Sequence, residues 1–127
     1  MFTYQQSNGK LYRDGLYFGT GWAVQGKGKN NSAEQSDPNI GPLPQGRYTI
    51  GPAYRHPRLG PVVMALTPDS HNQMYNRAFF RIHGAAHENP ATPQSEYELS
   101  SHGCIIMPRP VREKISASGD QDLEVIA

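Results

Sequence analysis

The chain has a single cysteine, Cys104, and a histidine, His83, that follows a short run of strand-forming residues and precedes a glycine. The histidine stands in Phe-Arg-Ile-His-Gly at 80–84, and the cysteine in Ser-Ser-His-Gly-Cys-Ile-Ile-Met at 100–107. A thiol attacks carbonyl groups poorly until a neighbouring base or positive charge stabilises the thiolate. With His83 as that base, we expect the thiol pKa to lie below its ordinary value of about 8.5. These residue types predict an acyl-transfer site.

The glycines beside these two residues fit the same chemistry. The backbone carbonyl of Gly84 is expected to accept a hydrogen bond from the His83 ring and so to fix its tautomer. Gly103 would let a substrate approach closely and would leave backbone N–H groups near Cys104 to hold an oxyanion.

Cys104 also has a structural interpretation. Free cysteines are among the most buried residues, and this one precedes the apolar run Ile105-Ile106-Met107, so it could be a small hydrophobe at the start of a core strand. The polar Ser-His-Gly directly before it is unusual in a core segment and favours the catalytic interpretation. With one cysteine and no matching pair of further ligands, we expect no metal site, no cofactor and no intrachain disulfide.

The composition indicates a β-rich fold with many turns, because 36% of the residues are apolar and the chain has 13 Gly and 11 Pro. Asn-Gly and Asp-Gly pairs between short aromatic runs predict hairpins at the N-terminus. We expect strands at 2–6, 10–13, 16–18, 62–66, 79–82 and 122–126, a Pro/Gly turn that leads into a further strand within 41–50, and one helix at 110–117. The polar residues 25–39 predict a long surface loop that either flanks a binding cleft or is an inert excursion.

Length and charge exclude several classes of protein. The chain of 127 residues fits a single domain, 1–127. Its net charge is +1 without any basic run, so we expect no nucleic-acid partner. The longest apolar stretch, 60–66, is too short for stable membrane insertion, and residues 1–6 lack the features of a signal peptide.

The motif residues resemble a known family. His83-Gly84, followed by Ser101-His102-Gly103-Cys104 and a hydrophobic residue, resembles the active-site signature of the YkuD-type L,D-transpeptidases. Gly-Pro-Leu-Pro-Gln-Gly-Arg-Tyr-Thr-Ile at 41–50 resembles the Pro-x-Gly-x-aromatic strand of that family. Over its whole length the chain is similar to a smaller branch, the L,D-transpeptidase effectors of type VI secretion. The resemblance implies a mainly β, YkuD-like sandwich or barrel with one short C-terminal helix.

The resemblance also implies residue roles. Cys104 would be the nucleophile and His83 the general base, while His102 would orient the thiol or the oxyanion region, and Ser101 and Gly103 would shape the pocket.

The substrate that the resemblance implies is a peptidoglycan tetrapeptide stem, in which diaminopimelate is followed by D-Ala. Water as acceptor gives L,D-carboxypeptidase action, a free D-amino acid gives exchange, and an amine of another stem gives a cross-link. The resemblance to toxic effectors favours trimming and exchange.

One position departs from the larger family, which has an arginine two residues after the cysteine, where this chain has Ile106. Arg81 and Arg109 are the candidates to hold the substrate carboxylate instead. Arg81 has a second interpretation as a solvated strand residue.

Localisation and partners follow from the resemblance. We expect synthesis in the cytoplasm without a signal peptide, export by the type VI secretion machinery, action in the target-cell periplasm, and a periplasmic immunity protein in the producer. Two other functions stay open. One is a non-catalytic peptidoglycan-binding module, and the other is a cysteine peptidase that cuts another stem amide.

Overall fold

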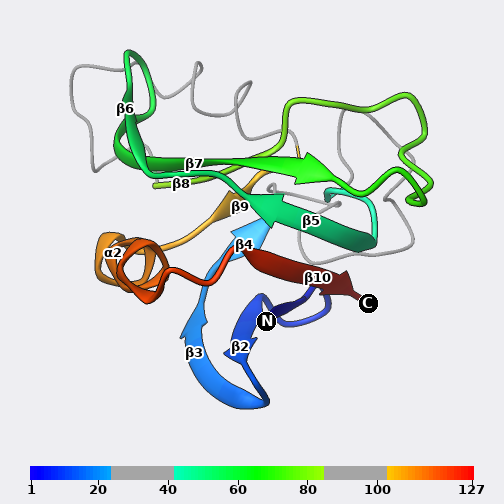
Figure 1. Cartoon of the computed structure of the whole chain (residues 1–127), viewed down its shortest axis with the longest axis horizontal. Helices are drawn as coiled ribbons and strands as arrows, with labels where there is room; N and C mark the ends of the chain where they lie inside the picture. The colour runs from blue at the N-terminus through cyan, green and yellow to red at the C-terminus, as the bar shows by residue number, and fades with distance from the viewer. Residues whose placement is uncertain (24–41, 85–102) are drawn as a thin grey trace.

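The computed structural model describes residues 1–23, 42–84 and 103–127. In this part of the chain the fold is mainly β with one short helix, as the sequence predicts, and the sheet is strongly curled into a half-barrel (Figure 1). The elements are β1 (Phe2–Gln5), β2 (Lys10–Arg13), β3 (Leu16–Thr20), β4 (Trp22–Ala23), β5 (Gly46–Ile50), β6 (Tyr54–His56), β7 (Gly60–Pro68), β8 (Arg81–His83), β9 (Ile105–Ile106), α2 (Arg109–Ser118) and β10 (Asp122–Ile126).

The N-terminal strands β1, β2 and β3 form the predicted antiparallel meander. The turn between β2 and β3 consists of Asp14 and Gly15, whose φ angles are 50° and 83°. Positive φ at both positions is the geometry of a type I′ turn, which matches the twist of the strands it joins. The local Asp-Gly signal therefore sets the register of this hairpin.

The C-terminal strand β10 lies in the middle of the sheet rather than at its edge. It pairs in parallel with β1, where Phe2 is opposite Leu123, and in antiparallel with β5, where Gly46 is opposite Val125. The strand order is β3-β2-β1-β10-β5-β7-β8-β9-β4, and β6 pairs with β7. The predicted strand at 122–126 is confirmed, and it joins the N-terminal meander to the strands that carry the candidate site.

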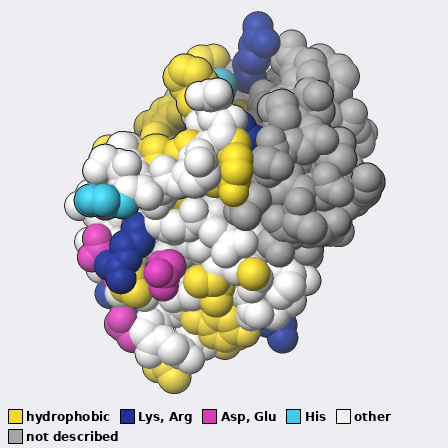
Figure 2. All heavy atoms as spheres, turned by 90° about the vertical axis from the view of Figure 1, so that its right-hand side faces the viewer, with side chains coloured by type: hydrophobic (Ala, Val, Ile, Leu, Met, Phe, Trp, Pro, Cys, Tyr) yellow, Lys and Arg dark blue, Asp and Glu magenta, His cyan; other side chains and the backbone are white. Residues whose placement is uncertain are grey.

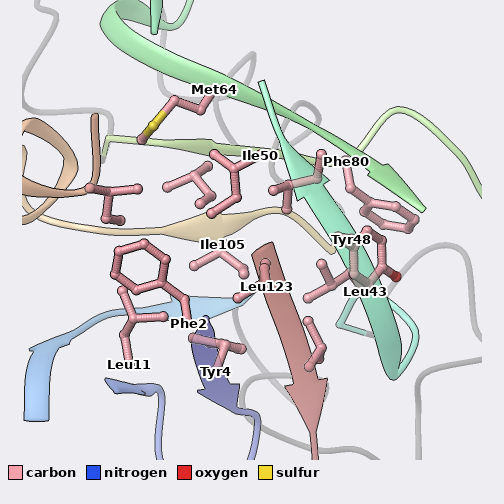
Figure 3. Close-up of a cluster of buried hydrophobic side chains, with 14 of the residues drawn as sticks. Phe2, Tyr4, Leu11, Leu43, Tyr48, Ile50, Met64, Phe80, Ile105 and Leu123 are labelled. Carbon is pink, nitrogen blue, oxygen red and sulfur yellow. The ribbon is translucent and has the colours of Figure 1, made fainter. Parts of the chain in front are cut away.

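One hydrophobic cluster holds these strands together (Figure 3). Alternate residues of β1, Phe2 and Tyr4, and of β10, Leu123 and Val125, are at most 1% exposed, as expected where one face of a sheet is buried. Each fully buried side chain of this size contributes about 1.5–3 kcal/mol to folding. The other buried members are Leu11, Leu43, Tyr48, Ile50, Met64, Leu66, Phe80, Ile82, Ile105, Met107 and Ile115.

Helix α2 packs against this cluster through Ile115, which is 2% exposed, and Val111, which is partly buried. Pro110 lies in its first turn, where a missing N–H costs no hydrogen bond, and Gly119 ends it in the left-handed conformation at φ 71°. The predicted helix at 110–117 is confirmed and is one residue longer at each end. In the part of the chain that the structure describes, no helix is long and apolar enough to cross a membrane.

Two short strands, β4 and β6, were not predicted, and β9 was expected only in the structural interpretation of Cys104 as the start of a core strand. β9 pairs in parallel with β8 and in antiparallel with β4, so the sheet ends in the order β8-β9-β4.

On the face shown in Figure 2, side chains of both charges lie close together and hydrophobic side chains gather in separate patches. The described part of this face shows no extended basic area, in keeping with the net charge of +1.

Candidate active site

The pairing of β8 with β9 brings the histidine and the cysteine to the same part of the sheet. Ile82 is paired with Ile105, and His83 with Ile106. Cys104 directly precedes β9, so it lies beside the start of β8, and His83 ends β8 two positions further on. Two positions along a strand correspond to about 6.6 Å. Two segments that are distant in sequence thus deliver a thiol and an imidazole to neighbouring positions.

The thiol of Cys104 lies against polar backbone groups. The Arg81 nitrogen donates a hydrogen bond to Sγ at 3.3 Å, and the thiol points to the Phe79 carbonyl oxygen at 4.0 Å. The residue is 1% exposed, which agrees with the interpretation as a buried small hydrophobe. It is not, however, a member of the hydrophobic cluster, whereas its neighbour Ile105 is. Cys104 is therefore a buried residue of the core whose sulfur lies against the polar backbone groups of Arg81 and Phe79.

Burial raises the pKa of the Cys104 thiol to about 11. The hydrogen bond from the Arg81 backbone and the charges of Arg81 and Arg77 act in the opposite direction, but their effect is smaller. The expectation that the pKa of this thiol lies below its ordinary value is wrong for this conformation. The reason is that the side chain is enclosed, and enclosure disfavours the charged thiolate.

The His83 ring is fixed by the next residue in the chain. Its Nδ1 lies 2.8 Å from the Gly84 carbonyl oxygen, and because a carbonyl only accepts, Nδ1 carries the proton and Nε2 the lone pair. His83 is 0% exposed. Burial, together with the smaller effect of the positive charges of Arg112 and Arg81, lowers the pKa of His83 to about 4, while the hydrogen bond to the Gly84 carbonyl acts in the opposite direction. At neutral pH the imidazole is therefore neutral and able to accept a proton.

Gly103 has a structural reason to be glycine that differs from the one offered by the sequence. Its φ is +94°, and an added Cβ would lie 2.6 Å from Arg77 Nη2 and 2.6 Å from Phe80 Cε1. Its carbonyl accepts a hydrogen bond from the Leu43 nitrogen at 3.0 Å. The space left by the missing side chain is thus filled by the protein itself.

The two candidate arginines lie in different surroundings. Arg81 is half-buried beside Cys104, and its Nε donates a hydrogen bond to the Tyr54 hydroxyl at 3.1 Å. Arg109 is exposed at the start of α2, where its Nε forms an ion pair with Glu113 at 2.8 Å. Of the two, the structure brings Arg81 next to the thiol.

Several predicted features lie outside the described residues. They are Ser101, His102 and the loop 25–39. Their predicted roles stay predictions. Two residues that the sequence reasoning missed, Arg77 and Arg112, are 8% and 1% exposed and lie close enough for their charges to act on Cys104 and His83 respectively. No local pattern marks either residue, because each becomes buried only through contacts between distant segments.

The comparison with protein families identifies the family of the chain. The sequence model of the Tlde1 domain matches residues 19–123, which include Cys104, His83 and the strands that carry them. Among curated proteins and among solved structures, nothing matches the chain.

Proposed function

Because the chain belongs to the Tlde1 domain family, the L,D-transpeptidase effectors of type VI secretion, we propose that it cleaves peptidoglycan tetrapeptide stems by acyl transfer through Cys104. Membership indicates a type VI secretion effector with L,D-transpeptidase-like activity that acts on peptidoglycan. The finer steps, the residue roles and a YkuD-like topology of one catalytic domain, 1–127, are our proposal.

The observation that carries the proposal is the parallel pairing of β8 with β9. It joins a thiol that accepts a hydrogen bond from the Arg81 nitrogen to an imidazole whose Nδ1 is held by the Gly84 carbonyl. An imidazole held in this way has Nε2 ready to accept the thiol proton. A thiol, a base and a group that orients the base are the parts that nucleophilic acyl transfer needs.

The reaction follows from these parts. Cys104 Sγ forms a bond to the carbonyl carbon of diaminopimelate, and the thiol proton moves to His83 Nε2. The same proton then passes to the leaving nitrogen as the C–N bond breaks, so that D-Ala departs and a thioester remains. Water that attacks the thioester completes an L,D-carboxypeptidase cycle, and a free D-amino acid completes an exchange. Either acceptor regenerates the Cys104 thiol.

The burial of Cys104 and His83 determines when the thiol proton moves to the imidazole. Between the pKa of His83, about 4, and that of Cys104, about 11, both groups are neutral. Proton transfer therefore accompanies attack on the substrate rather than preceding it, as for a serine paired with histidine. In this scheme Arg81 binds a substrate carboxylate, and Arg109 is the second candidate for that role. As the resemblance implies, His102 orients the thiol or the oxyanion region, and Ser101 and Gly103 shape the pocket.

The partners follow from the same proposal. The substrate lies in the periplasm of the target cell, so the type VI secretion machinery would deliver the protein there. A producing cell then needs a periplasmic immunity protein, and blocking access to Cys104 would be the most direct form of protection.

Product analysis tests the proposal. Purified tetrapeptide muropeptides are incubated with the protein and with Cys104→Ala, and the products are analysed by mass spectrometry. Loss of one D-Ala, or its replacement by an added D-amino acid, is expected for the wild type alone. A different cleavage mass would support a cysteine peptidase that cuts another amide. Binding without any product would support the peptidoglycan-binding module.

A further inference from the structure

Arg77 is a buried arginine in the segment that connects β7 to β8. It is 8% exposed, and its Nη1 donates a hydrogen bond to the Pro42 carbonyl at 2.6 Å. Its Cζ lies 5.1 Å from the centre of the Phe80 ring, which is within the range of a cation–π contact. One guanidinium therefore joins the residues that precede β5 to those that precede β8.

The same guanidinium closes the space beside Gly103, the residue that leads into Cys104. A Cβ at Gly103 would be 2.6 Å from Arg77 Nη2. On the peptide that follows, the Leu43 nitrogen donates a hydrogen bond to the Gly103 carbonyl at 3.0 Å. Because Gly103 has Arg77 on one side and Leu43 on another, the backbone before the thiol cannot shift unless one of them moves.

The connection that carries Arg77 has an uncommon backbone conformation. Tyr75, Asn76 and Phe79 have φ angles of 54°, 58° and 66°, in the left-handed region that few residues other than glycine adopt. Such conformations persist where surrounding contacts fix them, and they cluster at functional sites. Arg77 lies within this connection and contacts the Phe80 ring, and the carbonyl oxygen of the preceding residue, Phe79, lies 4.0 Å from Cys104 Sγ.

We propose that Arg77 is a positioning residue for Cys104: its guanidinium fixes Gly103 beside the thiol and supplies a permanent positive charge that stabilises the negative charge that develops on the sulfur as the thiol loses its proton. The proposal rests on the proposed function only in taking Cys104 as the nucleophile. A guanidinium stays protonated in proteins, and its attraction for an anion is stronger in a buried site than in water. In keeping with this, the charge of Arg77 lowers the pKa of the Cys104 thiol against the larger effect of burial.

The chain offers a clean way to measure this effect, because Cys104 is its only cysteine. Protein labelled with ¹³C at the cysteine Cβ gives one cysteine signal, whose chemical shift reports the thiolate fraction as the pH is raised. The variants are Arg77→Gln, which removes the charge, and Arg77→Lys, which keeps the charge but loses the planar group. Arg47→Gln is the matched control, because Arg47 is 66% exposed and pairs with Glu124 instead.

Arg77→Gln should reduce the thiolate fraction at a given alkaline pH about tenfold, the equivalent of one pKa unit. Arg77→Lys should restore most of that loss, and Arg47→Gln should titrate as the wild type does. A folded Arg77→Gln that titrates like the wild type would overturn the proposal, and so would a Lys variant that titrates like Gln.

A second variant covers the case in which Arg77→Gln does not fold. Phe80→Leu leaves the guanidinium in the chain but removes the ring on which it lies, so the thiolate fraction should fall by less than in Arg77→Gln. An unchanged titration in Phe80→Leu would then contradict the proposal. The measurement uses no substrate, so a failed assignment of the stem peptide would show only in the product analysis and would leave this result standing.

Discussion

The sulfur of Cys104 lies 3.3 Å from the backbone nitrogen of Arg81, which donates a hydrogen bond to it. A backbone N–H in this position stabilises a thiolate more than a thiol, since hydrogen bonds to charged acceptors are the stronger ones. The same strand carries His83 two residues later, with its ring held by Gly84. The start and the end of β8 thus offer the two groups that a thiol needs in order to lose its proton.

The buried imidazole predicts that the protein loses stability in acid. The pKa of His83 is about 4 when folded, below its ordinary value of 6.5, so between these values the unfolded chain binds a proton that the folded chain does not. The free energy of unfolding should therefore fall as the pH drops through this window, by on the order of 3 kcal/mol in total. Chemical denaturation at several pH values measures the change.

His83→Gln should remove most of this dependence, because the substituted side chain does not titrate. His71→Gln is the matched control, since the His71 side chain is 94% exposed. If the acid slope is the same in wild type and His83→Gln, the burial of a neutral His83 is not its cause.

The close contacts of Gly103 predict that Gly103→Ala is strongly destabilising. The added methyl group would meet Arg77 and Phe80 at 2.6 Å, and the φ of +94° adds backbone strain. Together these effects should cost about 2–4 kcal/mol of unfolding free energy. The control is Gly15→Ala, whose φ of +83° is similar but where nothing lies within 4 Å. A cost of about 1 kcal/mol is expected there, and equal costs at the two positions would mean that the contacts with Arg77 and Phe80 are unimportant.

Helix α2 offers a matched pair of arginines. Arg112 is 1% exposed and donates hydrogen bonds to the carbonyls of Met107, Pro61 and Val62 at 3.0, 2.8 and 3.1 Å. Arg112→Met should cost about 3 kcal/mol, because buried acceptors then lose a charged donor. Arg109→Met, which breaks an exposed pair, should cost about 0.5 kcal/mol. Urea unfolding distinguishes the two, and similar values would show that Arg112 does not hold these carbonyls.

The local parts of the fold could be predicted from the sequence. Asp14-Gly15 supplies the positive φ angles of its hairpin within two residues, and Pro110 and Gly119 mark the ends of α2 within a residue or two. The strand β4 could not be predicted, because it has two residues and exists only through pairing with the distant β9, and β9 itself was suggested only by the apolar residues that follow Cys104. The sequence patterns that predict strands need a longer run.

The residues of the candidate site could also be predicted only in part from the sequence. Cys104, His83 and the Gly84 carbonyl could be named as candidates from residue types next to glycines. Arg77 could not be found, since its relation to the thiol arises from packing between the residues before β5 and those before β8. The direction of the thiol pKa was wrong for a related reason, because the extent of burial belongs to the folded molecule and not to the motif.

The account depends most directly on a covalent bond between Cys104 and the stem peptide. Intact-protein mass spectrometry after rapid acid quenching of a reaction with tetrapeptide should show an adduct of the stem that has lost D-Ala, and peptide mapping should place it on Cys104. The adduct should be absent in Cys104→Ala and should form far more slowly in His83→Ala than in His102→Ala. An enzyme that releases D-Ala at the wild-type rate with alanine at position 104 would contradict the account.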